Sequence, residues 1–217
     1  MTLEPTSTVK PMLRLNPEDI QGEILCSIYP EGEIAVITAD GSDLTIVLEG
    51  SPALGINDNR HPAWLPSGKG YSYTVDDFSQ AEIWVADSLE GPGHFVLGDV
   101  ATYSSHSWSP DGRSLAYVSA SNQGVIFDLE SQNIYNLTTD QFRSAADPAW
   151  SPDGTRIAFS GSEGGRRDIY FINQEGNDEA MVVENLDAGI LADRRSHPNF
   201  LAGELRLELY DFGAGIK

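Results

Sequence analysis

The fold is decided by the stretch Asp147–Ser160, whose sequence is DPAWSPDGTRIAFS. It begins with a short apolar segment that ends in a tryptophan, and a tight turn follows. In this turn Pro152 presets φ, the carboxylate of Asp153 can bond nearby backbone groups, and Gly154 supplies the positive φ that closes a hairpin. After the turn, large apolar residues stand at every second position, which is the period of a β-strand. The stretch therefore predicts a β-hairpin.

This hairpin sequence recurs along the chain. A second strong copy, SHSWSPDGRSLAYV, occupies residues 105–118, and a fair copy, HPAWLPSGKGYSY, occupies residues 61–73. Degenerate copies lie at residues 197–207 and 13–19. The equivalent apolar positions are spaced by 49, 44, 42 and 50 residues, and they are Leu15, Trp64, Trp108, Trp150 and Phe200. Repeats of about 40–50 residues, each holding several short strands, are typical of propeller blades.

The pattern predicts an all-β protein, a β-propeller of about four to five four-stranded blades that is either small or partial. We expect a polar lead-in over residues 1–10 and the propeller over residues 11–217. The expected repeats lie near residues 11–50, 61–100, 105–140 and 147–185, with a partial repeat at 197–217.

The composition limits the partners and the location. Asp and Glu total 33 against 13 Lys and Arg, which gives a net charge of −20 and disfavours nucleic acid and anionic membrane surfaces. The acidity serves either solubility or recognition of a basic partner or of divalent cations. No apolar run reaches the ~20 residues of a transmembrane segment. The start lacks the features of a secretory signal, so we expect a cytoplasmic protein, or a periplasmic one if a leader has been removed. Cys26 is the single cysteine, which excludes an internal disulfide.

The repeat resembles a known family. Residues 148–160, followed by the strand-like DIYFI at 168–172 and a turn at 175–177, resemble the TolB-type, WD-like β-propeller repeat. Such repeats occur in TolB of the periplasm, in the propeller domains of prolyl-oligopeptidases and dipeptidyl-peptidases, and in many bacterial proteins. The resemblance covers about residues 11–212. It implies the fold and little of the function, because the repeated residues are packing and turn residues.

The chain also departs from these families. It shows neither the amino-terminal α/β domain and signal peptide of TolB nor the Gly-x-Ser-x-Gly elbow of the peptidases, whose nearest string here is Gly161–Gly164. The repeats are fewer than those families usually carry. The half repeat could close a small ring with the first blade, two or more chains could cover the open strand edges, or an open arc could dock on a partner.

Catalytic signatures are missing from the sequence. It shows no serine elbow, no Cys-His pair of family spacing, no phosphate-binding glycine loop and no zinc-type cluster. We therefore predict a protein that is not an enzyme and has no cofactor.

One constellation suggests a central site. Three residues before the repeated aromatic stand His61, Ser105, Asp147 and His197, and His106 follows Ser105. The innermost strand of each blade lines the channel of a propeller, so these side chains should converge there. His61, Asp147 and His197 could bind a divalent metal, since imidazole and carboxylate suit such ions. We favour the simpler interpretation, in which no metal binds and the group caps the channel mouth by bonding backbone groups or water.

The interaction surface is expected on irregular inserts, since loops on a rigid scaffold carry function. The inserts expected are residues 55–60, 88–93, 162–167 and 187–195. They hold small basic islands that could meet an anionic partner or simply be solvated, namely Arg60, Arg166, Arg167, Arg194 and Arg195. The repeated tryptophans are expected in the core between blades.

These observations favour a non-enzymatic propeller that serves as a scaffold or accessory subunit in protein–protein interaction, or that self-associates through open blade edges. One alternative is a propeller domain associated with an enzyme, either gating a peptidase or acting on carbohydrate with a metal in the channel. Another is a sensor of a small ligand or ion.

Overall fold

The structure is a computed structural model that describes residues 22–28, 32–50, 58–76, 79–91, 93–138, 142–163, 166–175, 180–183, 197–200 and 207–210. The regular elements of these ranges are all β-strands, as the repeat predicts. Within the same ranges no helix is long and apolar enough to cross a membrane.

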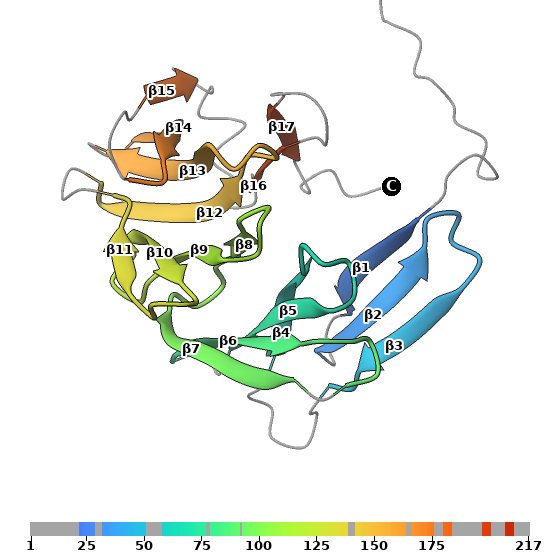
Figure 1. Cartoon of the computed structure of the whole chain (residues 1–217). Coiled ribbons are helices and arrows are strands. Elements are labelled where there is room, and N and C mark those ends of the chain that lie inside the picture. Colours follow the sequence, from blue (N-terminus) through green and yellow to red (C-terminus); the bar gives the residue numbers. More distant parts are fainter. Residues whose placement is uncertain are drawn as a thin grey trace, which may run out of the picture.

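The strands form five antiparallel sheets in chain order, which follow one another around a curve (Figure 1). The first sheet has three strands, β1 (Glu23–Ile28), β2 (Glu33–Thr38) and β3 (Leu44–Leu48). The second has four, β4 (Asp58–Trp64), β5 (Tyr71–Asp76), β6 (Ala81–Ala86) and β7 (His94–Val100). The third comprises β8 (Ser107–Trp108), β9 (Ser114–Val118), β10 (Gly124–Asp128) and β11 (Ile134–Asn136). The fourth comprises β12 (Ser144–Trp150), β13 (Arg156–Glu163), β14 (Arg166–Asn173) and β15 (Ala180–Val183), and the fifth pairs β16 (His197–Phe200) with β17 (Leu207–Tyr210).

The tight turns are closed as the Ser-Pro-Asp-Gly sequence predicts. Oδ1 of Asp153 accepts hydrogen bonds from Ser151 Oγ at 2.6 Å, from Thr155 N–H at 3.0 Å and from Thr155 Oγ1 at 2.8 Å. These donors, the Ser151 hydroxyl first, lower the pKa of Asp153 to about 2. Gly154 has φ +71°, which a side chain would strain. The turn between β8 and β9 repeats two of these bonds, since Oδ1 of Asp111 accepts from Ser109 Oγ and from Arg113 N–H.

Two of the inner strands continue past the expected hairpin through a bulge. The register shifts between Arg60 and Ala63 in β4, and between Ala146 and Ala149 in β12. At each bulge a residue before proline takes a left-handed backbone, His61 at φ +49° and Asp147 at φ +52°. The insert expected at residues 55–60 is therefore wrong at its end, since Asp58–Arg60 pair with β5.

The core lies between neighbouring sheets. Residues of β9 and β10 pack on residues of β12, β13 and β14 in one cluster, which is built around Ala116, Ile126, Trp150, Ile157 and Phe159. A second cluster joins the second and third sheets, and a third joins the first and second. Each sheet thus buries one apolar face against the next, which is how a propeller fills the space between its blades.

Candidate functional site

The structure brings together part of the group predicted to line the channel. Asp147 is buried, and its Oδ1 accepts a hydrogen bond from Ser105 Oγ at 3.1 Å, so equivalent positions of adjacent sheets touch. His61 is half-buried, and its proximity contributes to the lowered pKa of buried His106. His197 belongs to β16, but its side chain lies outside the described residues. The metal site of His61, Asp147 and His197 stays a prediction.

Within the residues that the structure describes, no group of three or more His, Cys, Asp or Glu side chains is arranged to hold a metal ion.

His106 is part of a buried hydrogen-bond network between the second and third sheets. Its Nε2 lies 2.6 Å from Ser72 Oγ and its Nδ1 lies 3.4 Å from Thr74 Oγ1. The indole N–H of Trp108 donates to the same Ser72 hydroxyl at 2.8 Å. Burial first, and the nearby His61 second, lower the pKa of His106 to about 3, so the ring is neutral at physiological pH. The network joins two blades rather than presenting a reactive group.

The next blade junction lacks this network because its residues differ at two equivalent positions. Ser72 and Ala116 occupy equivalent positions in their blades. Ser72 pairs with Ala63, which precedes Trp64, and Ala116 pairs with Ser107, which precedes Trp108. The repeat likewise places Pro148 where His106 stands. Among the described residues, the buried indole N–H of Trp150 consequently has no hydrogen-bond acceptor.

This difference yields a stability prediction. Ala116→Ser places a hydroxyl where Ser72 holds the Trp108 indole, so it is expected to raise the free energy of unfolding by about 0.5–1.5 kcal/mol. Urea denaturation followed by far-UV circular dichroism measures the change. The matched control is Ala158→Ser at the next equivalent position, where the repeated aromatic is Phe200 and offers no N–H. A stability gain in the control as large as in Ala116→Ser would contradict the explanation.

Two of the basic residues expected on irregular inserts, Arg60 and Arg167, have described side chains, and both lie in β-strands. Arg60 lies in β4 with its guanidinium 4.8 Å from the ring centre of Tyr103, a cation–π contact. Arg167 donates to Ser160 Oγ at 3.2 Å and to Ser144 Oγ at 3.4 Å.

The insert predicted at residues 162–167 is wrong, because β13 and β14 pair as far as Glu163 and Arg166. The side chain of Arg166, together with Arg194 and Arg195, lies outside the described residues. These arginines therefore stay a prediction as an interaction surface.

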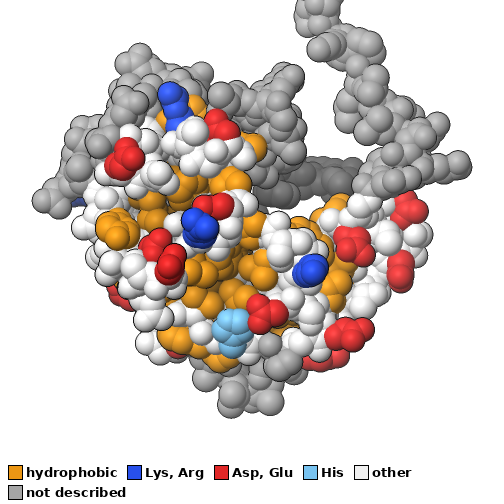
Figure 2. Space-filling view, in the orientation of Figure 1, with side chains coloured by type: hydrophobic (Ala, Val, Ile, Leu, Met, Phe, Trp, Pro, Cys, Tyr) orange, Lys and Arg blue, Asp and Glu red, His pale blue; other side chains and the backbone are white. Residues whose placement is uncertain are grey.

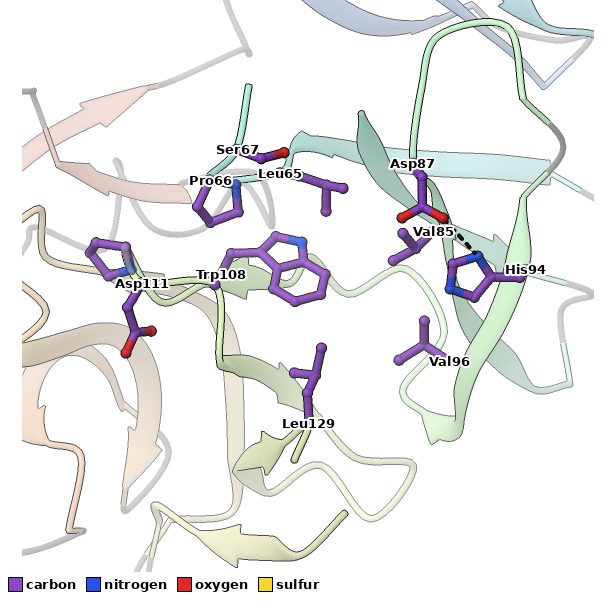
Figure 3. Close-up of a pocket in the computed structure, with 12 residues that line it drawn as sticks. Leu65, Pro66, Ser67, Val85, Asp87, His94, Val96, Trp108, Asp111 and Leu129 are labelled. Atoms are coloured by element: carbon purple, nitrogen blue, oxygen red, sulfur yellow. Dashed lines mark ion pairs between the residues drawn. The ribbon is translucent and has the colours of Figure 1, made fainter. Parts of the chain in front are cut away.

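A concave groove lies between the second and third sheets, with a cavity of about 510 Å³. We call it the Trp108 groove, after the half-buried ring at its centre (Figure 3). Its apolar lining comprises Leu65, Pro66, Val85, Val96, Trp108, Pro110 and Leu129. Its polar lining includes Ser67, Asp87, His94 and Asp111. Nδ1 of His94 is 3.7 Å from Oδ2 of Asp87, and their side chains are 57% and 82% exposed.

A smaller cavity of about 420 Å³ occupies the equivalent place between the third and fourth sheets. The registers pair Val85 with His94 in one groove and Ile126 with Tyr135 in the other. The repeated tryptophan of this second groove, Trp150, is buried, whereas Trp108 is half-buried. The groove is therefore a repeating feature of the fold, and only its lining differs.

Sequence reasoning missed the groove because it placed every repeated tryptophan in the core. Trp150 is buried as expected, but Trp64 and Trp108 are half-buried. The signal that could have found the groove is the turn LPSG at residues 65–68, where leucine replaces the first serine of the SPDG motif and adds apolar surface. On the face shown in Figure 2, hydrophobic side chains gather toward the centre, with acidic and a few basic side chains among and around them.

Comparison with known proteins agrees with this architecture. TolB of Acinetobacter baumannii superposes with a TM-score of 0.62 at 19% identity, covering 75% of this chain and 41% of that one. A TolB candidate from Agrobacterium tumefaciens superposes with a TM-score of 0.61 at 21% identity, covering 85% of this chain and 62% of that one. The fold is a TolB-like β-propeller. At this identity the likeness concerns the fold alone.

Two curated sequences are also similar. The uncharacterized protein Atu1656 of Agrobacterium fabrum is 26% identical over 195 residues, which are 84% of this chain and 64% of that protein. Dipeptidyl-peptidase 5 of Porphyromonas gingivalis is 33% identical over 104 residues, which are 43% of this chain and 14% of the peptidase. The chain thus spans less than two thirds of these relatives. No protein-family model matches the sequence.

Proposed function

We propose that this TolB-like propeller is a non-enzymatic module that binds a protein partner, and that the partner inserts an extended segment into the Trp108 groove. The observation that carries the proposal is the groove itself, an open cavity of about 510 Å³ whose lining is mostly apolar. A concave apolar site with a few polar groups is the usual form of a recognition site. The half-buried ring of Trp108 offers a rigid aromatic surface, which is a common anchor in interfaces.

The polar clusters support a binding role over a catalytic one. His106 is neutral and bonded to Ser72 and Thr74, and the Asp147 carboxylate accepts from Ser105. A general acid or base needs a pKa near the working pH and access to the substrate. Burial with a pKa of about 3 gives His106 neither property.

A peptide selection tests the proposal. A phage-displayed library of random nonapeptides is selected on the immobilised chain, and the recovered peptides are titrated into ¹⁵N-labelled protein. We expect shifts of the Trp108 indole N–H signal, which the variant Trp108→Phe identifies by its loss. The protein has four tryptophans, so the other three indole signals serve as internal controls. Selection of no peptide, or shifts that spare Trp108, would overturn the proposal.

A second role, the propeller domain of a peptidase, is favoured by the 33% identity to part of dipeptidyl-peptidase 5. Sequencing the gene on both sides of this region distinguishes the two roles. A hydrolase domain in the same reading frame would support the second role, and its absence would leave the binding module.

A further inference from the structure

The Trp108 groove combines an aromatic face with an exposed carboxylate. Asp87 and His94 stand at one end, with Val85 and Val96 between them and the indole (Figure 3). The side chain of Asp87 is 82% exposed, and its contact with His94 is a long one at 3.7 Å. An exposed carboxylate in such a contact is open to a stronger cationic partner, since charged hydrogen bonds are shorter.

The other carboxylate of the groove is already engaged. Oδ1 of Asp111 accepts from Ser109 Oγ at 2.6 Å and from Arg113 N–H at 3.1 Å. The Ser109 hydroxyl first, and the Arg113 backbone N–H second, lower the pKa of Asp111. The Asp111 carboxylate is thus occupied by hydrogen bonds within its own turn. Asp87 is the carboxylate of this groove that is placed to bind a ligand.

The equivalent groove shows what is particular to this one. Asp128 occupies the place of Asp87 there, but its Oδ1 accepts from Ser131 N–H at 2.7 Å and from Ser131 Oγ at 2.6 Å. Gln174 stands where the Trp108 groove has the apolar Leu129. Of the two grooves, the Trp108 groove has the more apolar floor. Among the described residues, its carboxylate, Asp87, is also not hydrogen-bonded within its own turn, whereas Asp128 is.

We infer that the partner segment of the Trp108 groove is basic: it carries an arginine or lysine next to a large apolar side chain. The cation would pair with Asp87 at the end of the groove, and its aliphatic stem would lie across Val85 and Val96 toward the Trp108 ring. The apolar neighbour would pack on Val96 and Leu129. The net charge of −20 favours the approach of such a segment. This inference rests on the proposed function.

The peptides recovered by the selection described above test the inference. We expect enrichment of Arg or Lys beside Leu, Ile, Phe or Trp. Isothermal titration of one such peptide should show a Kd about three- to tenfold weaker for Asp87→Asn than for the unchanged protein. Raising NaCl from about 50 to 200 mM should weaken binding to the unchanged protein more than to Asp87→Asn. The matched control is Glu175→Gln in the equivalent groove, which should leave the Kd unchanged.

The outcomes separate the inference from the proposed function. Peptides that shift the Trp108 signal without basic enrichment, and whose Kd is insensitive to Asp87→Asn, would overturn the basic partner and keep the binding module. Failure of any peptide to shift the Trp108 signal would overturn both. Free arginine amide is the last probe, since binding as tight as that of the peptides would show that a small cation rather than a peptide segment is the ligand.

Discussion

Replacing Trp150 with alanine is expected to lower the free energy of unfolding by about 3–5 kcal/mol. The side chain is 7% exposed and belongs to the cluster between the third and fourth sheets. It packs with Ala116, Ile126 and Ile157, which come from both sheets. Removing the ring leaves a cavity that rigid strands cannot close, so the cost of the cavity adds to the lost burial. Urea denaturation followed by far-UV circular dichroism measures the loss without depending on tryptophan fluorescence.

Trp150→Phe is the matched control for this prediction. The Nε1–H of Trp150 is buried without an acceptor among the described residues, so phenylalanine sacrifices ring volume but no hydrogen bond. Trp150→Phe should therefore lose clearly less stability than Trp150→Ala. Trp108→Phe behaves differently, because the Trp108 indole donates to Ser72 at 2.8 Å. An alanine variant that unfolds at the same urea concentration as the unchanged protein would refute the placement of Trp150 between blades.

The repeat made most of the fold predictable from sequence. The turn residues Pro152, Asp153 and Gly154 act locally, so their geometry follows from their chemistry alone. The alternation after the turn likewise predicted β13, in which Ile157 and Phe159 share one face and lie in the cluster between the third and fourth sheets. Ala158 and Ser160 on the other face are buried as well. A TolB-like propeller was therefore accessible from the sequence without any long-range information.

The bulges were not predictable in the same way. His61 and Asp147 precede proline, and proline within a strand pattern usually marks a strand end. The strand continues in each case because a left-handed residue absorbs the extra length, so Asp58–Arg60 and Ser144–Ala146 still pair. That outcome depends on the neighbouring strand, which a local pattern does not include.

The Trp108 groove was hidden for a related reason. Its lining comes from two different sheets, and the exposure of a repeated tryptophan depends on what the preceding blade places beside it. Trp108 has Leu65 and Val85 as neighbours in the groove, whereas the equivalent Trp150 is buried. Sequence equivalence predicted the same environment for both, and the structure shows that only the position is the same.

Acidification from pH 7 to pH 5 is expected to cost about 2 kcal/mol of stability through His106 alone. Its pKa is about 3 in the folded protein, where burial disfavours the cation, against 6.5 in the unfolded chain. Between these two values the unfolded chain binds the additional proton, so stability is retained above pH 6.5 and falls as the pH drops below it. Each pH unit in this window costs about 1.4 kcal/mol once the unfolded histidine is mostly protonated.

The variant His106→Gln should remove this dependence, because glutamine can still bond Ser72 and does not titrate. Glutamine does not fill the imidazole site fully, so the variant is expected to be less stable at every pH. The comparison therefore uses the slope of the unfolding free energy against pH. His94→Gln is the matched control, since it removes a histidine whose side chain is 57% exposed and lies outside the Ser72–His106–Trp108 network. An independent measurement is the His106 Cε1 proton signal, which should not titrate between pH 7 and pH 5. An unaltered slope in His106→Gln would show that the Ser72–His106–Trp108 network does not hold a neutral imidazole between the blades.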